Sequence, residues 1–367
     1  MQGANMDYAV IMAGGSGKRL WPLSRQKRPK QILKILDGQT LLRLCYQRLR
    51  SNFDKDRIIV QTNAAYSGLV RENLPEIGVH NIIAEPCVRD TAGAIGLAAA
   101  VLTKTDADAT TAVVTADQLI EPADTFENAM KDAIAYVNSS PESLLTFGIK
   151  PNNTSTEFGY IKCVEPKKYP CCNSEIFKVA AFKEKPDEQT ARKYLQDQNF
   201  LWNSGMFVWK AKTILKYLEK FLPESTEPLQ YIQAAWASDE QKKTLYEWYP
   251  KIPKISIDFS VMENADNVYA IRLDCKWLDL GAFTALVDFI DSDKDNNIIV
   301  AGHSELLDCK NNIVVTEQQE HLIAAIGLEN MVVAHTPDAT LICNKEDTKR
   351  LKELLEIIRL HKGERFL

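Results

Sequence analysis

The chain has 367 residues, of which 45% are hydrophobic and 25% charged, and its formal net charge is −5. This length predicts one large domain with a smaller one, and the mildly acidic charge argues against a general nucleic-acid binder. The sequence has no apolar stretch of membrane-spanning length, and residues 1–7 lack the apolar core of a signal peptide. We therefore predict a cytoplasmic protein with neither nucleic acid nor membrane as a partner.

The first predicted element is a buried strand over the apolar run 8–13. It is followed by small residues that let the backbone turn sharply and whose N–H groups can cradle phosphate oxygens, namely Gly14, Gly15, Ser16 and Gly17. Six cations come next without an intervening carboxylate, namely Lys18, Arg19, Arg25, Lys27, Arg28 and Lys30. A strand, a small-residue turn and a run of cations suit a polyphosphate ligand.

Two common phosphate motifs fail on this stretch. A P-loop needs Gly five residues before its Gly-Lys, where this chain has Met12, and Ser or Thr afterwards, where it has Arg19. The dinucleotide fingerprint, started at Gly15, meets Leu20 in place of its third Gly. A glycine-rich turn with solvated cations is the plainer alternative.

Alternating strands and helices continue after this stretch. Apolar periodicity predicts a helix at 40–50, strands at 57–62, 81–84 and 111–116, and helices at 64–74 and 89–104. This alternation is typical of an α/β fold with a doubly wound, mainly parallel sheet.

The pattern changes twice in the second half of the chain. After a strand at 144–150, a β-rich insertion is predicted, with strands at 158–165, 176–184, 202–209 and 268–273 and a helix at 187–196. Further helices are predicted from the end of the strand at 202–209 to about Trp248, and a short helix at 257–263. From about residue 295 there are short apolar strands at 297–300, 313–315, 322–325, 331–334 and 341–343, and then a closing helix at 351–360. We predict two domains, 1–292 and 293–367.

The stretch Gly14–Ser24, with its Trp-Pro-Leu-Ser piece, and the following Arg28-Pro-Lys-Gln31 resemble the signature of the sugar-nucleotide pyrophosphorylases. The resemblance is strongest to the bacterial type of mannose-1-phosphate guanylyltransferase. It implies a Rossmann-like doubly wound fold, the nucleotide-diphospho-sugar transferase fold, with a small C-terminal left-handed β-helix-like domain. Longer relatives add a cupin phosphomannose isomerase domain, which we expect to be absent because the chain stops at Leu367.

The resemblance also implies a reaction, in which GTP and mannose 1-phosphate give GDP-mannose and pyrophosphate. Its catalytic residues would be Arg19, Lys30 and Lys185. Its nucleotide site would comprise Ala13, Gly14, Gly15, Ser16, Gly17, Lys18, Glu85, Arg89 and Thr91. Its sugar-phosphate site would comprise Gly159, Tyr160, Glu184, Lys185 and Asn203.

Two lone aspartates are candidate metal ligands. Asp117 directly follows a predicted strand, and Asp279 lies in Trp277-Leu-Asp-Leu-Gly281. Each alone can equally be a turn-capping residue. In the resembled family the matching aspartates hold the metal, so we expect Mg²⁺ or Mn²⁺ bound by these two carboxylates and by substrate phosphates.

Glu85 is the candidate for base recognition, because one carboxylate can accept from both N1–H and the 2-amino group of guanine. A helix cap supplied by Glu85 or Asp90 explains the same sequence equally well. The family usually has Asn and then Pro where this chain has Asp90 and Gly93, which leaves the detailed base contacts open.

Two other functions compete with this prediction. One is a pyrophosphorylase for another sugar 1-phosphate, and the other is a non-catalytic regulatory subunit that binds sugar nucleotides. The retained cations and aspartates argue against the regulatory subunit, since binding alone does not need leaving-group cations. The sequence does not fix the sugar epimer, the feedback regulation or the oligomeric state, and a homodimer stays open.

Overall fold

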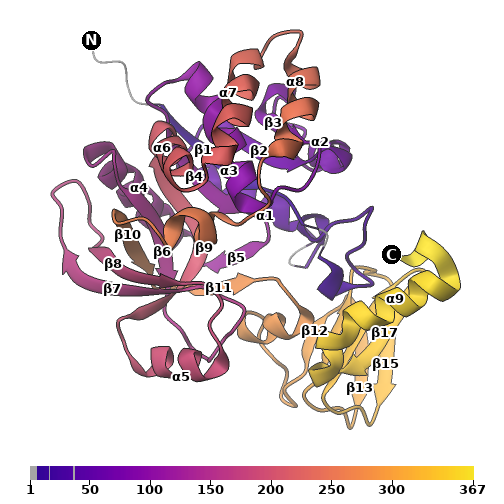
Figure 1. The fold of residues 1–367 in the computed structure, drawn as a ribbon. Helices are drawn as coiled ribbons and strands as arrows, with labels where there is room; N and C mark the ends of the chain where they lie inside the picture. Colours follow the sequence, from indigo (N-terminus) through magenta and orange to yellow (C-terminus); the bar gives the residue numbers. More distant parts are fainter. Residues whose placement is uncertain (1–5, 16, 36–37) are drawn as a thin grey trace. The chain divides into compact units, whose positions relative to one another are not determined.

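The computed structural model describes residues 6–15, 17–35 and 38–367 (Figure 1). By their internal contacts the residues form two compact units. The first unit comprises 1–12, 47–115 and 121–275, and the second comprises 13–46, 116–120 and 276–367. Each unit is thus assembled from three separate segments of the chain.

The first unit is built on a nine-stranded sheet with the order β3-β2-β1-β4-β9-β6-β10-β8-β7. Four strands at one side run parallel, namely β1 (Asp7–Met12), β2 (Ile58–Asn63), β3 (Ile82–Glu85) and β4 (Thr110–Thr115). Val10 of β1 pairs with Ile59 on one side and with Val113 on the other. Because β1 has neighbours on both edges, its apolar run is buried in the middle of this sheet, as the sequence predicted.

The other half of the sheet is mixed. It contains β6 (Leu144–Ile149), β7 (Tyr160–Lys167), β8 (Ile176–Lys183), β9 (Phe200–Lys210) and β10 (Val268–Leu273). Strand β9 is antiparallel to both β4 and β6, whereas β10 is parallel to β6. The predicted doubly wound α/β fold is confirmed, and its parallel character is concentrated in the N-terminal strands.

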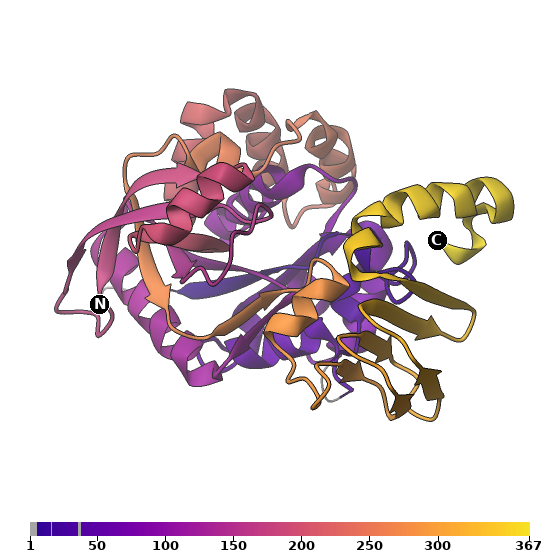
Figure 2. The same cartoon turned by 90° about the horizontal axis from the view of Figure 1, so that it is seen from below.

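Helices cover both faces of this sheet (Figures 1 and 2). On one face α3 (Asp90–Thr105) packs against α6 (Ala211–Phe221) and α7 (Thr226–Ala235), and α4 (Ala123–Ser139) lies on the other face. The remaining helices are α1 (Leu41–Leu49), α2 (Ser67–Asn73), α5 (Glu188–Gln196), α8 (Gln241–Trp248) and a π-helical turn at Asp258–Met262. In the described part of the chain, no helix has both the length and the hydropathy of a membrane span.

The second unit contains a coil of short strands and a closing helix. Its strands are β12 (Ile298–Val300), β13 (His303–Leu307), β14 (Ile313–Thr316), β15 (Leu322–Ile326), β16 (Met331–Thr336) and β17 (Ala339–Asn344), and its helix is α9 (Leu351–Lys362). Ile313 of β14 pairs in parallel with Ile298 of β12 and with Val332 of β16, and β13 pairs in parallel with β15. Strands from successive turns therefore stack in register, which gives the expected β-helix-like domain.

The core of the second unit joins the beginning of the chain to its end. Leu20, Trp21 and Leu33 belong to the same buried cluster as Ile313 and Leu355. Polar contacts reinforce it, because Trp21 Nε1 donates to the Phe366 carbonyl at 2.6 Å and Arg25 pairs with Asp338 at 2.6 Å. The segment that follows β1 is therefore held by residues that come about 300 positions later.

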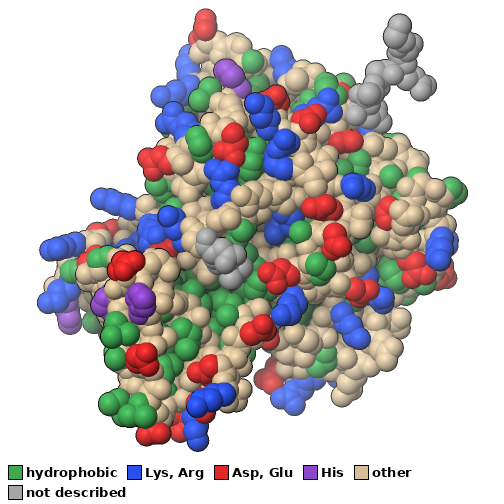
Figure 3. All heavy atoms as spheres, turned by 180° about the vertical axis from the view of Figure 1, so that it is seen from behind, with side chains coloured by type: hydrophobic (Ala, Val, Ile, Leu, Met, Phe, Trp, Pro, Cys, Tyr) green, Lys and Arg blue, Asp and Glu red, His purple; other side chains and the backbone are tan. Residues whose placement is uncertain are grey.

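One sheet of this unit keeps apolar side chains at its surface. Leu307 of β13 pairs with Ile326 of β15, and they are 59% and 74% exposed. Figure 3 shows hydrophobic side chains gathered at the lower left, over these strands.

Four elements were not predicted, namely α4, β5 (Gln118–Glu121), β11 (Lys276–Asp279) and β13. Strands β5 and β11 pair with each other as a two-stranded sheet. This pair of strands matters for function because Asp117 directly precedes β5 and Asp279 is the last residue of β11.

Candidate active site

The glycine-rich turn leaves open space beside its backbone. Ala13 is buried at the end of β1, and the Gln31 side chain donates to its carbonyl at 2.7 Å. Gly14 and Gly15 are exposed, with no atom within 4 Å of the place where a Cβ would stand, and Gly15 has a φ of +98°. A ligand can therefore approach this backbone closely. The predicted nucleotide residue Ser16 lies outside the described residues.

Gly17 connects this turn to Lys30. It has a φ of +61°, and a Cβ on it would stand 2.7 Å from Lys30 Cβ. Its carbonyl accepts from the Leu20 N–H at 2.8 Å and from the Ser24 hydroxyl. Glycine is needed here both for the left-handed backbone and for the close packing of Lys30.

Lys30 lies between the two candidate metal ligands. Its Nζ forms an ion pair with Asp117 Oδ2 and lies 3.8 Å from Asp279 Oδ1. Asp117 immediately precedes β5, and Asp279 is the last residue of β11. The pairing of these strands, with the Leu280 N–H donating to the Asp117 carbonyl at 3.3 Å, brings together two carboxylates that are 162 residues apart.

The electrostatics of this group favour a cation between the carboxylates. Burial lowers the pKa of Lys30, but the charges of Asp117 and Asp279 outweigh it, so the pKa is raised overall. Arg19 lies nearby, because its Nη2 is 3.3 Å from the place where a Cβ on Gly281 would stand. Arg19 and Lys18 are both exposed.

The two carboxylates fit a divalent ion bound jointly by protein and substrate. They converge on one cationic group, and carboxylate oxygens are the ligands that Mg²⁺ prefers. Among the described residues no group of three or more His, Cys, Asp or Glu side chains is arranged to hold a metal. A site made of two carboxylates leaves further coordination positions for phosphate and water.

Glu85 is the buried last residue of β3, in the first unit. Its Oε2 accepts from the Tyr249 hydroxyl at 2.6 Å, and Gln61 also hydrogen-bonds to the carboxyl group. Burial raises the pKa of Glu85, and these two hydrogen bonds oppose the rise. The Glu85 carboxyl group at the strand end therefore has two hydrogen-bond partners, the side chains of Tyr249 and Gln61.

The start of α3 holds the other predicted residues of this segment. Arg89 precedes the helix without a side-chain cap and donates to the Pro250 carbonyl, while Asp90 Oδ1 accepts from the Thr91 N–H at 2.8 Å. The Thr91 hydroxyl accepts from the Ile257 N–H at 2.8 Å. Arg89 and Thr91 therefore anchor the segment 250–257 against this helix start.

The predicted sugar-phosphate residues gather around Gly159. A Cβ on Gly159 would stand 2.3 Å from Glu184 Oε2 and 3.5 Å from Asn203 Cβ, and the Gly159 carbonyl accepts from the Asn203 N–H at 2.8 Å. Lys185, which has a φ of +44°, forms an ion pair with Glu184 at 3.0 Å. Tyr160 is buried, and its hydroxyl donates to the Ser155 carbonyl. The structure thus brings these residues into one neighbourhood, with Tyr160 in its packed interior.

Sequence reasoning missed Asp258, which belongs to the same neighbourhood. The Asn203 Nδ2 donates to Asp258 Oδ1 at 3.0 Å. Desolvation of its carboxyl group, followed by the charge of Glu184, raises the pKa of Asp258 to about 7. Nearby, Glu263 accepts from the Glu184 N–H at 2.9 Å. The apolar spacing of 257–263 indicated a short helix, and nothing in that pattern marked Asp258 as a partner of Asn203.

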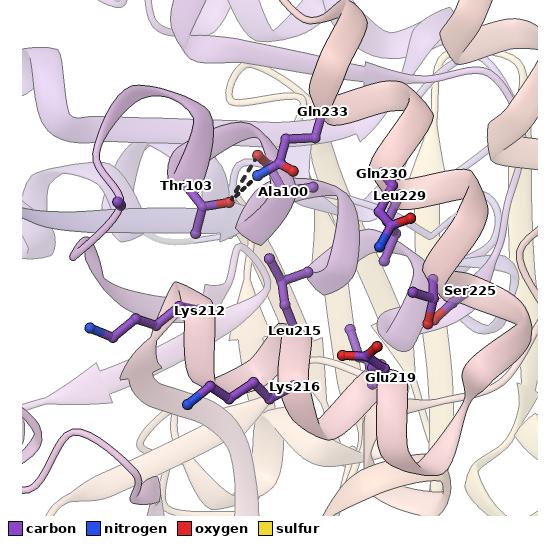
Figure 4. Close-up of a pocket in the computed structure, with 13 residues that line it drawn as sticks. Ala100, Thr103, Lys212, Leu215, Lys216, Glu219, Ser225, Leu229, Gln230 and Gln233 are labelled. Carbon is purple, nitrogen blue, oxygen red and sulfur yellow. Dashed lines mark hydrogen bonds between the residues drawn. The ribbon is translucent and has the colours of Figure 1, made fainter.

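A groove elsewhere in the first unit contains none of the predicted residues (Figure 4). It has a volume of about 420 Å³ and lies among α3, α6 and α7. Gln233 donates to Thr103 at its rim at 2.8 Å. Its two lysines are already neutralised, since Lys212 pairs with Asp108 and Lys216 with Glu142.

Both parts of the chain match known protein families. Residues 8–296 match the family model of nucleotidyl transferases, and residues 302–358 match that of the mannose-phosphate isomerase/GMP-like β-helix domain. The chain is 34% identical to a mannose-1-phosphate guanylyltransferase of Klebsiella pneumoniae, over 95% of this chain and 73% of that protein. It is 35% identical to mannose-1-phosphate guanylyltransferase 2 of Escherichia coli O157:H7, over 98% and 75%.

A solved structure is similar over nearly the whole chain. A protein of Thermus thermophilus, described as a mannose-1-phosphate geranyltransferase, superposes with a TM-score of 0.86 at 29% identity. The superposition covers 96% of this chain and 99% of that one.

Proposed function

Because the chain belongs to the mannose-1-phosphate guanylyltransferases of the nucleotidyl transferase family, we propose that it transfers a guanylyl group from GTP to mannose 1-phosphate. An oxygen of the sugar phosphate attacks the α-phosphorus of GTP in line. A new P–O bond forms, the bond between the α- and β-phosphates breaks, and the products are GDP-mannose and pyrophosphate. The nucleophile is already an anion, so the reaction needs no general base.

Catalysis then rests on positioning and on neutralising charge. The open backbone of Gly14 and Gly15, followed by Gly17, holds the triphosphate. Arg19 and Lys30 stabilise the charge that grows on the α-phosphate and the leaving pyrophosphate. In the first unit, Lys185 neutralises the attacking sugar phosphate.

Asp117 and Asp279 are the residues that would hold the metal, for which we propose Mg²⁺ or Mn²⁺. The bound ion would supply charge neutralisation at the phosphates. The observation that carries this assignment is that both carboxylates converge on the Lys30 ammonium, a site that already selects a cation. Lys30 would then pass from the carboxylates to the phosphates when the ion binds.

Glu85 is proposed to recognise guanine by accepting from N1–H and the 2-amino group. Its burial at the end of β3 supports this role, because a buried carboxylate discriminates strongly between donors that pair and groups that do not. Tyr249 would hold the carboxylate in place through the 2.6 Å hydrogen bond.

The test is an assay of pyrophosphate release with each nucleoside triphosphate, Mg²⁺ and a panel of sugar 1-phosphates. We expect GTP with mannose 1-phosphate to give the highest kcat/KM, with GDP-mannose identified by mass spectrometry. A higher value with another sugar 1-phosphate would assign a different pyrophosphorylase. No release with any pair would favour a non-catalytic subunit that binds sugar nucleotides.

Three broader assignments accompany this proposal. A nucleotidyltransferase domain over 1–292 would be followed by a β-helical domain over 293–367. The protein would act in the cytoplasm, where GTP is present, and nucleic acid and membranes would not be partners. A homodimer is proposed only as the assembly to look for first, by light scattering.

A further inference from the structure

We propose that Asp258 is a positioning residue for the sugar site, which fixes the Asn203 amide so that Asn203 acts on the sugar as a hydrogen-bond donor beside the Glu184 acceptor. The inference rests on the proposed function. It adds a residue that the sequence motifs did not contain, and it assigns a direction to the hydrogen bonds of the sugar site.

The orientation of an asparagine amide follows from the fixed donors and acceptors around it. The Gly205 backbone N–H can only donate, and it lies 3.3 Å from the Asn203 oxygen. The ionised Asp258 carboxylate can only accept, and it lies 3.0 Å from the Asn203 nitrogen. The Thr146 hydroxyl, 2.9 Å from the Asn203 oxygen, is compatible with either arrangement. Gly205 and Asp258 therefore set the orientation between them.

This orientation limits what the amide can offer to a ligand. The Asn203 oxygen accepts from the Gly205 N–H and faces the Thr146 hydroxyl, whose one proton can go either to this oxygen or to the Met206 carbonyl at 3.0 Å. One proton of Nδ2 goes to Asp258, so the amide can present its second proton. Asn203 is thus a donor toward the sugar.

Glu184 supplies the complementary acceptor. Its Oε2 and the Asn203 Cβ both lie within 3.5 Å of the same point, the place where a Cβ on Gly159 would stand. A hydroxyl group placed between them can accept from Asn203 and donate to Glu184. This paired contact requires a hydroxyl group on the sugar. A deoxy sugar, with hydrogen in its place, makes neither hydrogen bond, and a fluoro sugar cannot donate to Glu184.

The charges facing Asp258 make the orientation of the Asn203 amide depend on pH. Desolvation and Glu184 raise the pKa of Asp258 to about 7, whereas Asn203 and Lys185 oppose the rise. Above that pH the carboxylate only accepts, and the amide is held. Below it the protonated group can also donate, and the orientation is less tightly fixed.

The experiment compares Asp258→Ala with Asp258→Asn by saturation kinetics. Asp258→Ala should raise the KM for mannose 1-phosphate by about tenfold, equivalent to ~1.4 kcal/mol, with the KM for GTP within about twofold. Asp258→Asn keeps an oxygen that can accept from Asn203 and should recover most of the loss. In the wild type the KM for mannose 1-phosphate should rise as the pH falls through about 7. The substrate phosphate also titrates, but it does so equally for Asp258→Asn, so the rise in the wild type should exceed the rise in that variant.

Monodeoxy analogues of mannose 1-phosphate provide the second readout. The wild type should discriminate strongly against the analogue that lacks the paired hydroxyl, and Asp258→Ala should discriminate about tenfold less. A matched control is Asp132→Asn, a buried carboxylate that accepts from the Asn173 and Ser174 N–H groups away from these residues. It should lower thermal stability without changing the KM for the sugar.

An unchanged KM and unchanged discrimination in Asp258→Ala would overturn the inference, as would equal losses for both substrates. A wild-type protein that makes no GDP-mannose would instead overturn the proposed function. The two failures are therefore distinguishable.

Discussion

At the scale of single residues, the charges of the two carboxylates around Lys30 are balanced before substrates bind. One ammonium group balances two carboxylates, while Arg19 lies exposed nearby. These cations differ in what they can do, because a guanidinium can hold two phosphate oxygens at once and an ammonium cannot. Substitutions of Arg19 and of Lys30 should therefore have different effects.

Removing Arg19 should affect turnover. We expect Arg19→Ala to lower kcat by roughly 10²-fold, the scale of one lost transition-state donor, and Arg19→Lys to recover only part of it. Steady-state kinetics at saturating substrates would measure this. A loss confined to the KM for GTP would show that Arg19 binds only the ground state.

Removing the Lys30 charge should affect metal binding in the absence of substrates. Because Lys30 competes with the ion for both carboxylates, Lys30→Gln should bind Mn²⁺ about tenfold more tightly than the wild type, although its turnover is lost. Titration followed by electron paramagnetic resonance measures free Mn²⁺ directly. Lys27→Gln is the matched control, since Lys27 belongs to the same basic run but forms no described ion pair with either aspartate. Equal or weaker binding by Lys30→Gln would contradict the competition.

Substituting Glu85 should affect base choice. Glu85→Gln should weaken GTP and reduce the preference for GTP over ITP, which lacks the 2-amino group. Tyr249→Phe leaves the carboxylate but removes its 2.6 Å hydrogen bond, so it should lower activity with both nucleotides while keeping most of the preference. The ratio of kcat/KM values measures the effect, and an unchanged ratio in Glu85→Gln would leave Glu85 a structural residue of the β3 end.

At the scale of elements, the pairing of β5 with β11 brings together Asp117 and Asp279, the proposed metal ligands. Neither strand was predicted, because each spans only four residues and pairs with a partner about 160 positions away. Periodicity reports local regularity, and it cannot reveal such a pairing. The resemblance to a known family was what named Asp117 and Asp279, and the pairing supplies the physical reason they meet.

How well the other strands and helices were predicted depended on the strength of the apolar pattern in their own sequence. Strand β1 and helix α9 were predicted within two residues at each end, because their apolar patterns are strong. Helix α4 carries a usable signal that was overlooked, with buried residues at the helical spacing of 126, 129, 130, 133 and 137. Asp258 gave no signal, because its role depends on a neighbour 55 positions away.

The metal site should behave as one unit. Asp117→Ala and Asp279→Ala should each remove nearly all turnover, and the double variant should be little worse than either one. EDTA should abolish activity, and Mg²⁺ or Mn²⁺ should restore it. Thermal melting would check that the variants remain folded. Normal turnover by Asp279→Ala would return that residue to the role of a turn.

At the scale of the whole molecule, the turn proposed to bind phosphate is supported by C-terminal residues. Leu20, Trp21 and Leu33 share a core with Ile313 and Leu355, so the sequence boundary at 292 does not separate this turn from its support. Sequence reasoning placed that boundary by a change of texture. It could not detect that residues 13–46 pack in the same compact unit as residues 276–367.

Shortening the chain should therefore damage the nucleotide site. A protein ending at residue 292 is expected to lose GTP binding and most of its soluble yield, because it exposes this core. Two point variants on α9 provide a finer comparison. Leu355→Ala, in the core, should cost about 2–5 kcal/mol, whereas Ile357→Ala, at a half-exposed position, should cost about 0.5 kcal/mol or less. Calorimetry and GTP titration would measure both, and a fully active protein ending at residue 292 would contradict the expectation.

The shared core also determines when, during translation, the basic turn can pack against its core partners. Residues 14–33 leave the ribosome about 300 residues before their apolar partners at 313–355 are complete. At about 5–20 residues per second, the wait is on the order of 15–60 s. During that interval the basic turn lacks its core partners, so we expect the nascent chain not to bind GTP at this turn. Nucleotide binding would then begin only after residues 313–355 have been made and have folded.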